Sequence, residues 1–201
     1  MKHNDVIVGK ASPDEFRINP TELEARIGSK YCVESLEKLI QEHNKAAHYK
    51  YAYTEFPLRI DDDVVDLGFI NIKSSSLSKV LEGCERAILI ALSSGLDVDR
   101  LISKKHYLSD TDAFLLDAIA SAAVESFADY VCANISKNKA MTRRFSPGYA
   151  DFSIEVQPAF LDSLDAHNTV GIALTDSFLM IPAKSITAII GIKKDVYEQI
   201  D

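Results

Sequence analysis

The chain has 201 residues, of which 47% are hydrophobic and 26% charged, a composition typical of a globular protein that buries a core without disulfides or metals. Lys and Arg number 22 against 30 Asp and Glu, so the formal net charge is −8. An acidic chain without a long basic run is unsuited to nucleic acid, because phosphate contacts need clustered cations. Three separated cysteines fit neither a disulfide framework nor a zinc site and favour a reducing compartment. Neither a signal-peptide pattern nor an apolar run of membrane-spanning length occurs, so the sequence predicts a cytoplasmic protein without a membrane partner.

Helical signals recur along the chain. Asn19-Pro20 predicts an N-cap followed by Pro at the first helical position, with the helix ending at Gly28. Apolar spacing predicts a second helix through about His43 and short helices over 77–81 and 157–164, and Gly95 leads into another. The longest helix is expected from a cap at Asp110 or Asp112 to about residue 135. Its predicted buried stripe consists of Phe114, Leu115, Ile119, Ala122, Phe127, Tyr130 and Val131.

Strand signals lie between these helices. Residues 49–60 and 64–72 predict a hairpin around a turn of three aspartates, with Gly68 as a bulge. The continuous apolar run 86–92 predicts a strand buried on both faces. Residues 170–174, 178–181 and 186–192 predict a meander of three strands. Because helices and strands mix without regular alternation and no linker divides the chain, we expect one α+β domain over residues 1–201.

A cation, a tight turn and an aromatic ring lie within six residues in Arg144-Phe-Ser-Pro-Gly-Tyr149. Arg binds a carboxylate through two parallel hydrogen bonds, and Tyr offers a flat face and a hydroxyl. Pro147-Gly148 fits the central positions of a type II turn, and Gly148 allows a ligand to approach the backbone closely. From the residues alone two interpretations stay open: a surface turn with an exposed Arg, and a site for a small zwitterion.

Two carboxylates accompany this motif. Glu125 lies on the long helix upstream, beside small residues, where it either receives an ammonium group or is an ordinary solvated helix residue. Asp151 follows the motif and is equally suited to a ligand contact or to a structural cap. The sequence contains no phosphate-binding loop, nucleophile elbow, zinc-binding motif or calcium loop, so we predict neither catalytic nor metal-binding residues.

Three sequence blocks together resemble the activation domain of cobalamin-dependent methionine synthase, in particular its stand-alone form. They occur in that family's order, and the resemblance is best over residues 110–192 and weaker over 1–109. The family has an acidic residue where this chain has Asn138, and it has Pro-Ala-Cys-Pro where this chain has residues 150–153. The blocks are Ala122-Ala-Val-Glu-Ser-Phe-Ala-Asp-Tyr130, Arg144-Phe-Ser-Pro-Gly-Tyr149, and Gly171-Ile-Ala-Leu-Thr-Asp-Ser177 with Met180-Ile-Pro-Ala-Lys-Ser185.

The resemblance implies a twisted, mostly antiparallel sheet with flanking helices and an S-adenosylmethionine site. Arg144 would hold the methionyl carboxylate, Glu125 would take the amino group, Gly148 would admit the ligand and Tyr149 would wall it, with Asp151 a further candidate contact. The family restores the cobalamin of methionine synthase by reductive methylation, with an electron from a flavodoxin or similar donor. The cobalamin would be carried by a partner, a methionine synthase or corrinoid protein lacking its own activation domain.

Three functions therefore remain in competition. The first is an S-adenosylmethionine-binding accessory protein for reactivation, associated with a methyltransferase. The second is a non-catalytic interaction module that docks on a corrinoid protein with a degenerate ligand site. The third is an independent enzyme acting on another small amino acid or nucleotide.

Overall fold

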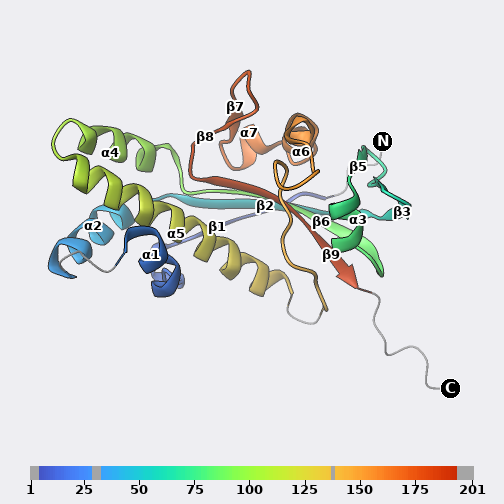
Figure 1. The fold of residues 1–201 in the computed structure, drawn as a ribbon, viewed down its shortest axis with the longest axis horizontal. Helices are drawn as coiled ribbons and strands as arrows, with labels where there is room; N and C mark the ends of the chain where they lie inside the picture. The colour runs from blue at the N-terminus through green and yellow to red at the C-terminus, as the bar shows by residue number, and fades with distance from the viewer. Residues whose placement is uncertain (1–4, 29–32, 137–138, 194–201) are drawn as a thin grey trace.

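A computed structural model describes residues 5–28, 33–136 and 139–193 of the chain. Its centre is a four-stranded sheet in the order β1-β2-β6-β9, in which every neighbouring pair is antiparallel. These strands are β1 (Ile7–Ala11), β2 (Tyr49–Pro57), β6 (Cys84–Ser93) and β9 (Ser185–Lys193). Figure 1 shows the sheet running along the length of the molecule, with helices on either side of it. The predicted α+β class and antiparallel sheet are confirmed, whereas β1 was not predicted.

Strand β6 is the axis of the core, because it pairs with β2 on one side and β9 on the other. It is buried from Ala87 to Ser93, as its continuous apolar run predicts. Successive side chains point to opposite faces of a strand, so Ile88 and Ile90 enter one hydrophobic cluster, and Leu89 and Ala91 enter the other. The sheet therefore has a buried cluster on each face.

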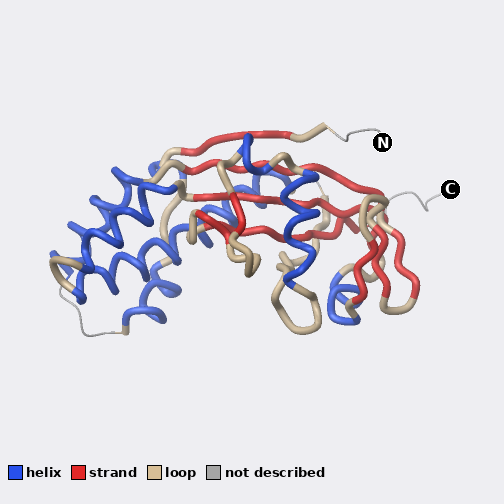
Figure 2. Tube along the Cα trace, turned by 90° about the horizontal axis from the view of Figure 1, so that it is seen from above, coloured by secondary structure: helices blue, strands red, loops and turns tan. Residues whose placement is uncertain are grey.

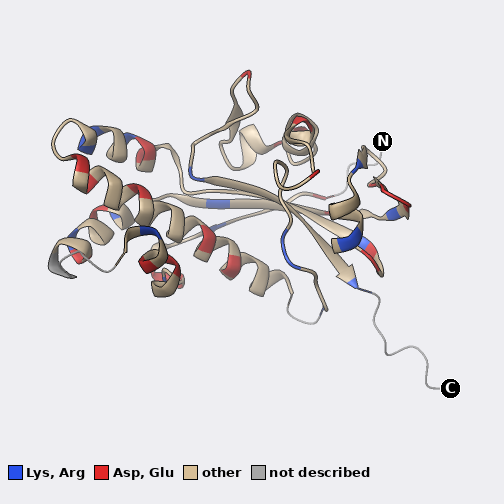
Figure 3. Cartoon of the chain, in the orientation of Figure 1, with Lys and Arg blue, Asp and Glu red and all other residues tan. Residues whose placement is uncertain are grey.

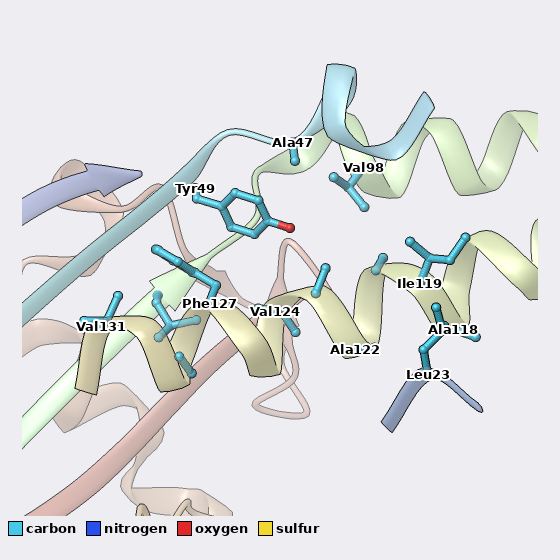
Figure 4. Packing of buried hydrophobic residues seen from close by; sticks show 14 of the residues in the cluster. Leu23, Ala47, Tyr49, Val98, Ala118, Ile119, Ala122, Val124, Phe127 and Val131 are labelled. Atoms are coloured by element: carbon cyan, nitrogen blue, oxygen red, sulfur yellow. The ribbon is translucent and has the colours of Figure 1, made fainter. Parts of the chain in front are cut away.

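One face of the sheet is covered by the long helix α5 (Asp110–Ile135) together with α1 (Pro20–Ile27), α2 (Val33–Ala46) and α4 (Leu96–His106). Figure 2 shows these helices gathered toward one end of the sheet. The ring of Tyr49 points from β2 toward α5, and its centroid lies 4.7 Å from that of Phe127 (Figure 4). Val98 of α4 and Leu23 of α1 pack into the same cluster. This aromatic contact fixes α5 on the sheet, and with it the helix face that carries Glu125.

The caps explain where these helices begin. Asn19 Oδ1 accepts hydrogen bonds from the Thr21 and Glu22 amides, so the predicted start of α1 is confirmed. The predicted cap of α5 is wrong: Ser109 occupies that position and its Oγ accepts from the Asp112 amide, which places Asp110 and Asp112 inside the first turn.

The predicted stripe of α5 is largely correct. Leu115, Ile119, Ala122, Phe127 and Val131 are buried. The other two predicted members differ, since Phe114 is 48% exposed and Tyr130 is half-buried with its hydroxyl donating to Glu15.

The other face of the sheet packs against smaller elements. A three-stranded sheet contains β3 (Arg59–Asp61), β4 (Val64–Asp66) and β5 (Asn71–Lys73), and the helix α3 (Ser75–Val80) follows it. Next to them lie a 3₁₀ turn (Ile154–Val156), α6 (Gln157–Ser163) and α7 (Ala166–Thr169). A further 3₁₀ turn, Pro13–Glu15, follows β1. Figure 1 shows α3 and β3–β5 at the opposite end of the molecule from α2 and α4.

Three strand predictions are wrong in detail. Residues 49–60 form two strands, because β2 pairs with β6 through Pro57, with the Leu58 amide still donating to the carbonyl of Glu85, whereas β3 pairs with β4 in a different sheet. Residues 64–72 also divide into two strands, and Gly68 lies in the turn between them rather than in a bulge. The predicted meander is replaced by a separate pair, β7 (Ala173–Leu174) with β8 (Met180–Ile181), while β9 joins the central sheet.

The edge of β9 that faces away from β6 forms backbone hydrogen bonds with another segment. Residues 140–145 run along it in isolated antiparallel bridges, and Phe145 exchanges two backbone hydrogen bonds of 2.9 Å with Ile189. The Thr142 amide donates to the carbonyl of Gly191, and the Thr142 Oγ1 accepts from the Gly191 amide. This ladder holds the segment that contains Arg144 beside α5. Within the described ranges, the helices include none of the length and apolarity needed to cross a membrane.

Candidate functional site

The best candidate site lies where the 140–145 segment meets α5. Glu125 and Asp129 are four residues apart and therefore share one face of the helix. Arg144 reaches this face from the β9 edge, and its Nη2 donates to Glu125 Oε2 at 2.9 Å. Its Nη1 lies 3.0 Å from Asp129 Oδ1. Figure 3 shows the acidic positions recurring along α5 and the basic positions on the neighbouring segment.

The guanidinium of Arg144 is mostly buried but is not fully satisfied. Its side chain is 20% exposed, and its Nη1 makes no hydrogen bond of acceptable geometry within the described residues, although Asp129 is near in distance. Burial raises the pKa of Glu125, while the positive charge of Arg144 opposes that rise. Nη1 is shielded from solvent on the Asp129 side of the ion pair, and the pocket reaches Arg144 on the side of Glu125.

A pocket of about 380 Å³ opens at this ion pair, within the usual size range of small-molecule sites. Glu125 and Arg144 lie on one side of it, and the ring of Tyr149, which is 66% exposed, offers a free aromatic face. The structure thus brings together three of the five predicted site residues. The full lining consists of Glu125, Arg143, Arg144, Phe145, Ser146, Tyr149, Ala150 and Ile186.

The predicted turn is present and positions Tyr149. Gly148 has φ 90°, the conformation that the third position of a type II turn requires, and the Tyr149 amide donates to the carbonyl of Ser146 at 3.4 Å. The Gly148 amide also donates to the carbonyl of Phe152 at 2.7 Å. A Cβ at Gly148 would strain the backbone and would lie 3.4 Å from Ile154 Cδ1. Gly148 therefore shapes the loop, and it is not among the residues that line the pocket.

Asp151 binds the N-terminus of α3 and not the pocket. Its Oδ1 accepts from the Ser74 hydroxyl at 2.8 Å, and its Oδ2 accepts from the Ser75 amide at 2.8 Å. The Ser76 amide also donates to Oδ1, at 3.1 Å. These hydrogen bonds, the one from Ser74 foremost, lower the pKa of Asp151 to about 2. Asp151 thus fastens the loop after Tyr149 to the N-terminus of α3, which is the structural cap that the sequence left open, and it does not line the pocket.

Sequence reasoning missed Asp129 and Arg143, and it left Lys184 as a structural cap or a surface charge, whereas the structure places this second cation on the same face of α5. Lys184, in the link from β8 to β9, donates from Nζ to Asp117 Oδ1 at 2.7 Å and to Ser121 Oγ at 3.0 Å. The signal was present, since residues 117, 121, 125 and 129 recur at a spacing of four and so form one ridge of the helix. Asn138, where the chain departs from the family pattern, lies outside the described residues.

Comparisons with known proteins agree with this fold. No protein-family model and no curated protein matches the sequence significantly. Among solved structures, the chain is similar to the crystal structure of the MetH reactivation domain bound to AdoHcy. The TM-score is 0.67 at 17% identity, over 96% of this chain and 80% of that chain. The twisted antiparallel sheet and flanking helices that the sequence resemblance predicted are therefore those of the MetH reactivation domain, and this chain has that fold.

Proposed function

We propose that this chain binds S-adenosylmethionine or its demethylated product in the pocket between Arg144, Glu125 and Tyr149. The observation that carries the proposal is the pairing of the Arg144 guanidinium with the Glu125 carboxylate at the wall of a pocket that Tyr149 also lines. The fold is that of a domain solved with AdoHcy, which supports the same class of ligand.

The residues fit the amino-acid end of such a ligand. An α-amino acid presents a carboxylate and an ammonium group close together, and the pocket offers a guanidinium and a carboxylate close together. The carboxylate of the ligand would accept from the guanidinium of Arg144, and its ammonium would donate to Glu125. Tyr149 would lie against the adenosine or the sulfonium, since a cation is attracted to an aromatic face. Gly148 and Asp151 would act indirectly, by holding the loop that carries Tyr149.

The proposed role is to support the reactivation of a cobalamin carried by a partner, a methionine synthase or corrinoid protein without its own activation domain. The cobalamin, held by the partner and reduced by one electron from a donor of the flavodoxin type, would be the acceptor of the methyl group, and S-adenosylhomocysteine would remain in the pocket of this chain. The part assigned to this chain is to hold the sulfonium ligand and dock on the partner.

The first experiment is a calorimetric titration of the full chain with S-adenosylmethionine and S-adenosylhomocysteine. We expect Arg144→Ala to weaken binding at least tenfold, about 1.4 kcal/mol. Arg59→Ala is the matched control, because it removes the same charge from the exposed strand β3 and should leave binding unchanged. Equal affinity of wild type and Arg144→Ala would refute the assignment of the pocket.

The partner is tested separately, with a corrinoid methionine synthase that lacks an activation domain, a chemical reductant and radiolabelled methyl donor. Transfer of label to the partner that depends on wild-type chain, and fails with Arg144→Ala, is the expected result. Docking without ligand binding or label transfer would favour the non-catalytic interaction module instead. Ligand binding without docking on any corrinoid protein would favour an independent enzyme.

A further inference from the structure

A second, larger cavity lies away from the Arg144 pocket, with a volume of about 640 Å³. It forms where the end of β1, the start of β2 and the start of α4 meet the loops that follow α7 and β8. The two cavities share no lining residue. This one is lined by Lys10, Ala11, Ser12, Pro13, Ala47, His48, Tyr49, Lys50, Gly95, Leu96, Val170, Gly171 and Pro182.

The charge of this cavity is opposite to that of the protein. Lys10 and Lys50 line it, and no aspartate or glutamate of the described residues does, although the chain carries a net charge of −8. Lys10 and Lys50 also make no ion pair within the described part of the chain, where four other lysines do. His48 and Tyr49 are the other titratable lining residues, and the Nε2 of His48 lies 3.5 Å from Oδ2 of Asp97, which does not line the cavity.

The two lysines are placed directly against each other. In the antiparallel register of β1 and β2, Lys10 is the partner of Lys50, so their side chains leave the same face of the sheet. Like charges in directly opposed positions repel and destabilise a strand pair. An anion with two negative charges between them would convert this repulsion into two attractive contacts.

The cavity also has the walls that a small organic molecule needs. Pro13, Val170 and Pro182 contribute apolar surface, and Gly95 lines the cavity where its segment approaches His48. Gly95 has φ 88°, and a Cβ at this position would lie 3.2 Å from His48 Cβ, so the close approach of the two segments depends on glycine. Its volume falls within the range of small-molecule sites, which combine apolar walls with a few charged groups.

We propose that this cavity, with Lys10 and Lys50 opposed across β1 and β2, is a binding site for a small organic dianion, a phosphate ester or a dicarboxylate. The site is separate from the Arg144 pocket, so the result of its test does not depend on whether the chain binds S-adenosylmethionine.

The test uses the full chain and two simple probes, inorganic pyrophosphate and succinate, followed by amide chemical shifts at constant ionic strength. Ionic strength is fixed with sodium chloride, because surface electrostatics weaken as salt rises. We expect saturable shifts at Lys10, Lys50 and Gly95, and at least a tenfold weaker affinity in the double variant Lys10→Gln, Lys50→Gln. The variant should fold as well as wild type, since it removes a repulsion, and thermal unfolding checks this.

The matched control is the double variant Lys38→Gln, Lys104→Gln. These lysines lie on helices α2 and α4, and replacing them lowers the net charge by the same amount as replacing Lys10 and Lys50. Binding retained in this control and lost in the Lys10, Lys50 variant supports the site. Binding of pyrophosphate alone identifies a phosphate ester, binding of succinate alone a dicarboxylate, and binding of both a general dianion site. Equal weakening in both double variants, or no saturable shift with either probe, overturns the proposal.

Discussion

Arg144 and Glu125 already hold each other, so an amino-acid ligand must enter an existing ion pair. Arg144 can accommodate the ligand because its planar fork has five donors, and only part of that capacity is used. Glu125 is prepared in a different way, because burial disfavours its ionised form. An incoming ammonium would restore the interactions that this carboxylate lacks.

The first residue-scale prediction concerns Glu125→Gln. The variant keeps an acceptor for Arg144 but loses the charge that attracts the ammonium, so we expect S-adenosylmethionine to bind about tenfold more weakly, ~1.4 kcal/mol. Because the pKa of Glu125 is raised, wild-type affinity should start to fall at a higher pH than for an ordinary glutamate. Calorimetry from pH 8 down to pH 4.5, the ordinary pKa of glutamate, should show this loss in wild type and not in Glu125→Gln. A pH profile that is the same in both proteins would contradict the role of Glu125.

The second residue-scale prediction concerns Asp151→Asn. The pKa of Asp151 is lowered to about 2 in the folded chain from its usual value of 3.8, so its ionised form stabilises the fold. That stabilisation is fully present above pH 3.8 and is lost as the pH falls toward 2. We therefore expect Asp151→Asn to melt at a lower temperature than wild type at pH 6, with the difference closing near pH 2.

The control for this prediction is Asp162→Asn, at an exposed position of α6, whose side chain makes no hydrogen bond or ion pair within the described residues. It should melt like wild type across the same pH range. A difference between wild type and Asp151→Asn that stays constant with pH would mean that the charge of Asp151 is not what fastens the loop to α3.

Helix α5 decides most of the architecture at the scale of elements, since it contacts the sheet and carries the ridge of residues 117, 121, 125 and 129. Its first turn depends on the Oγ of Ser109. We expect Ser109→Ala to lower the free energy of unfolding by about 1 kcal/mol, measured by denaturant titration. Ser103→Ala, at an exposed position inside α4, should change it by less than half of that amount, because no cap is lost.

A second element-scale prediction concerns the contact between β9 and α6. The hydroxyl of Thr187 donates to Gln157 Oε1 at 2.7 Å, and both residues are buried. Thr187→Val preserves the shape but leaves the amide oxygen of Gln157 without its donor. We expect a loss of about 1–3 kcal/mol in the free energy of unfolding. Combining Thr187→Val with Gln157→Leu should recover part of this loss, and an additive result would show that the hydrogen bond is not the cause.

Elements with local signals could be predicted from the sequence, and those set by distant partners could not. Asn19, Pro20 and Gly28 act on their own backbone, so both ends of α1 were predictable. The division of residues 49–60 depends on the change of partner strand from β6 to β4, which no local pattern records. The same holds at the site. The turn at Gly148 was predictable, whereas the direct pairing of Arg144 with Glu125 and the use of Asp151 at α3 follow from how β9, α5 and α3 pack.

At the scale of the whole molecule, the two hydrophobic clusters lie on opposite faces of one sheet, and a single domain remains a prediction that unfolding can test. Leu89 and Ile90 are neighbours on β6 but belong to different clusters. We expect Leu89→Ala and Ile90→Ala each to cost about 2–5 kcal/mol and to shift one common unfolding transition. Amide signals from α5 and from α6 should disappear together in denaturant, and separate midpoints would show that the two faces unfold as independent units.

The ladder between residues 140–145 and β9 also constrains the order in which parts of the chain can fold. β9 is the last described strand, and it pairs with β6 far back in the chain while supporting the segment that holds Arg144. Closing such distant pairings is slow, because the entropy of a large loop must be overcome first. A nascent chain that has not yet released residue 193 from the ribosome therefore has no completed Arg144 pocket. The proposed ligand would therefore bind only after the sheet has closed, and it would not act as a template for the early steps of folding.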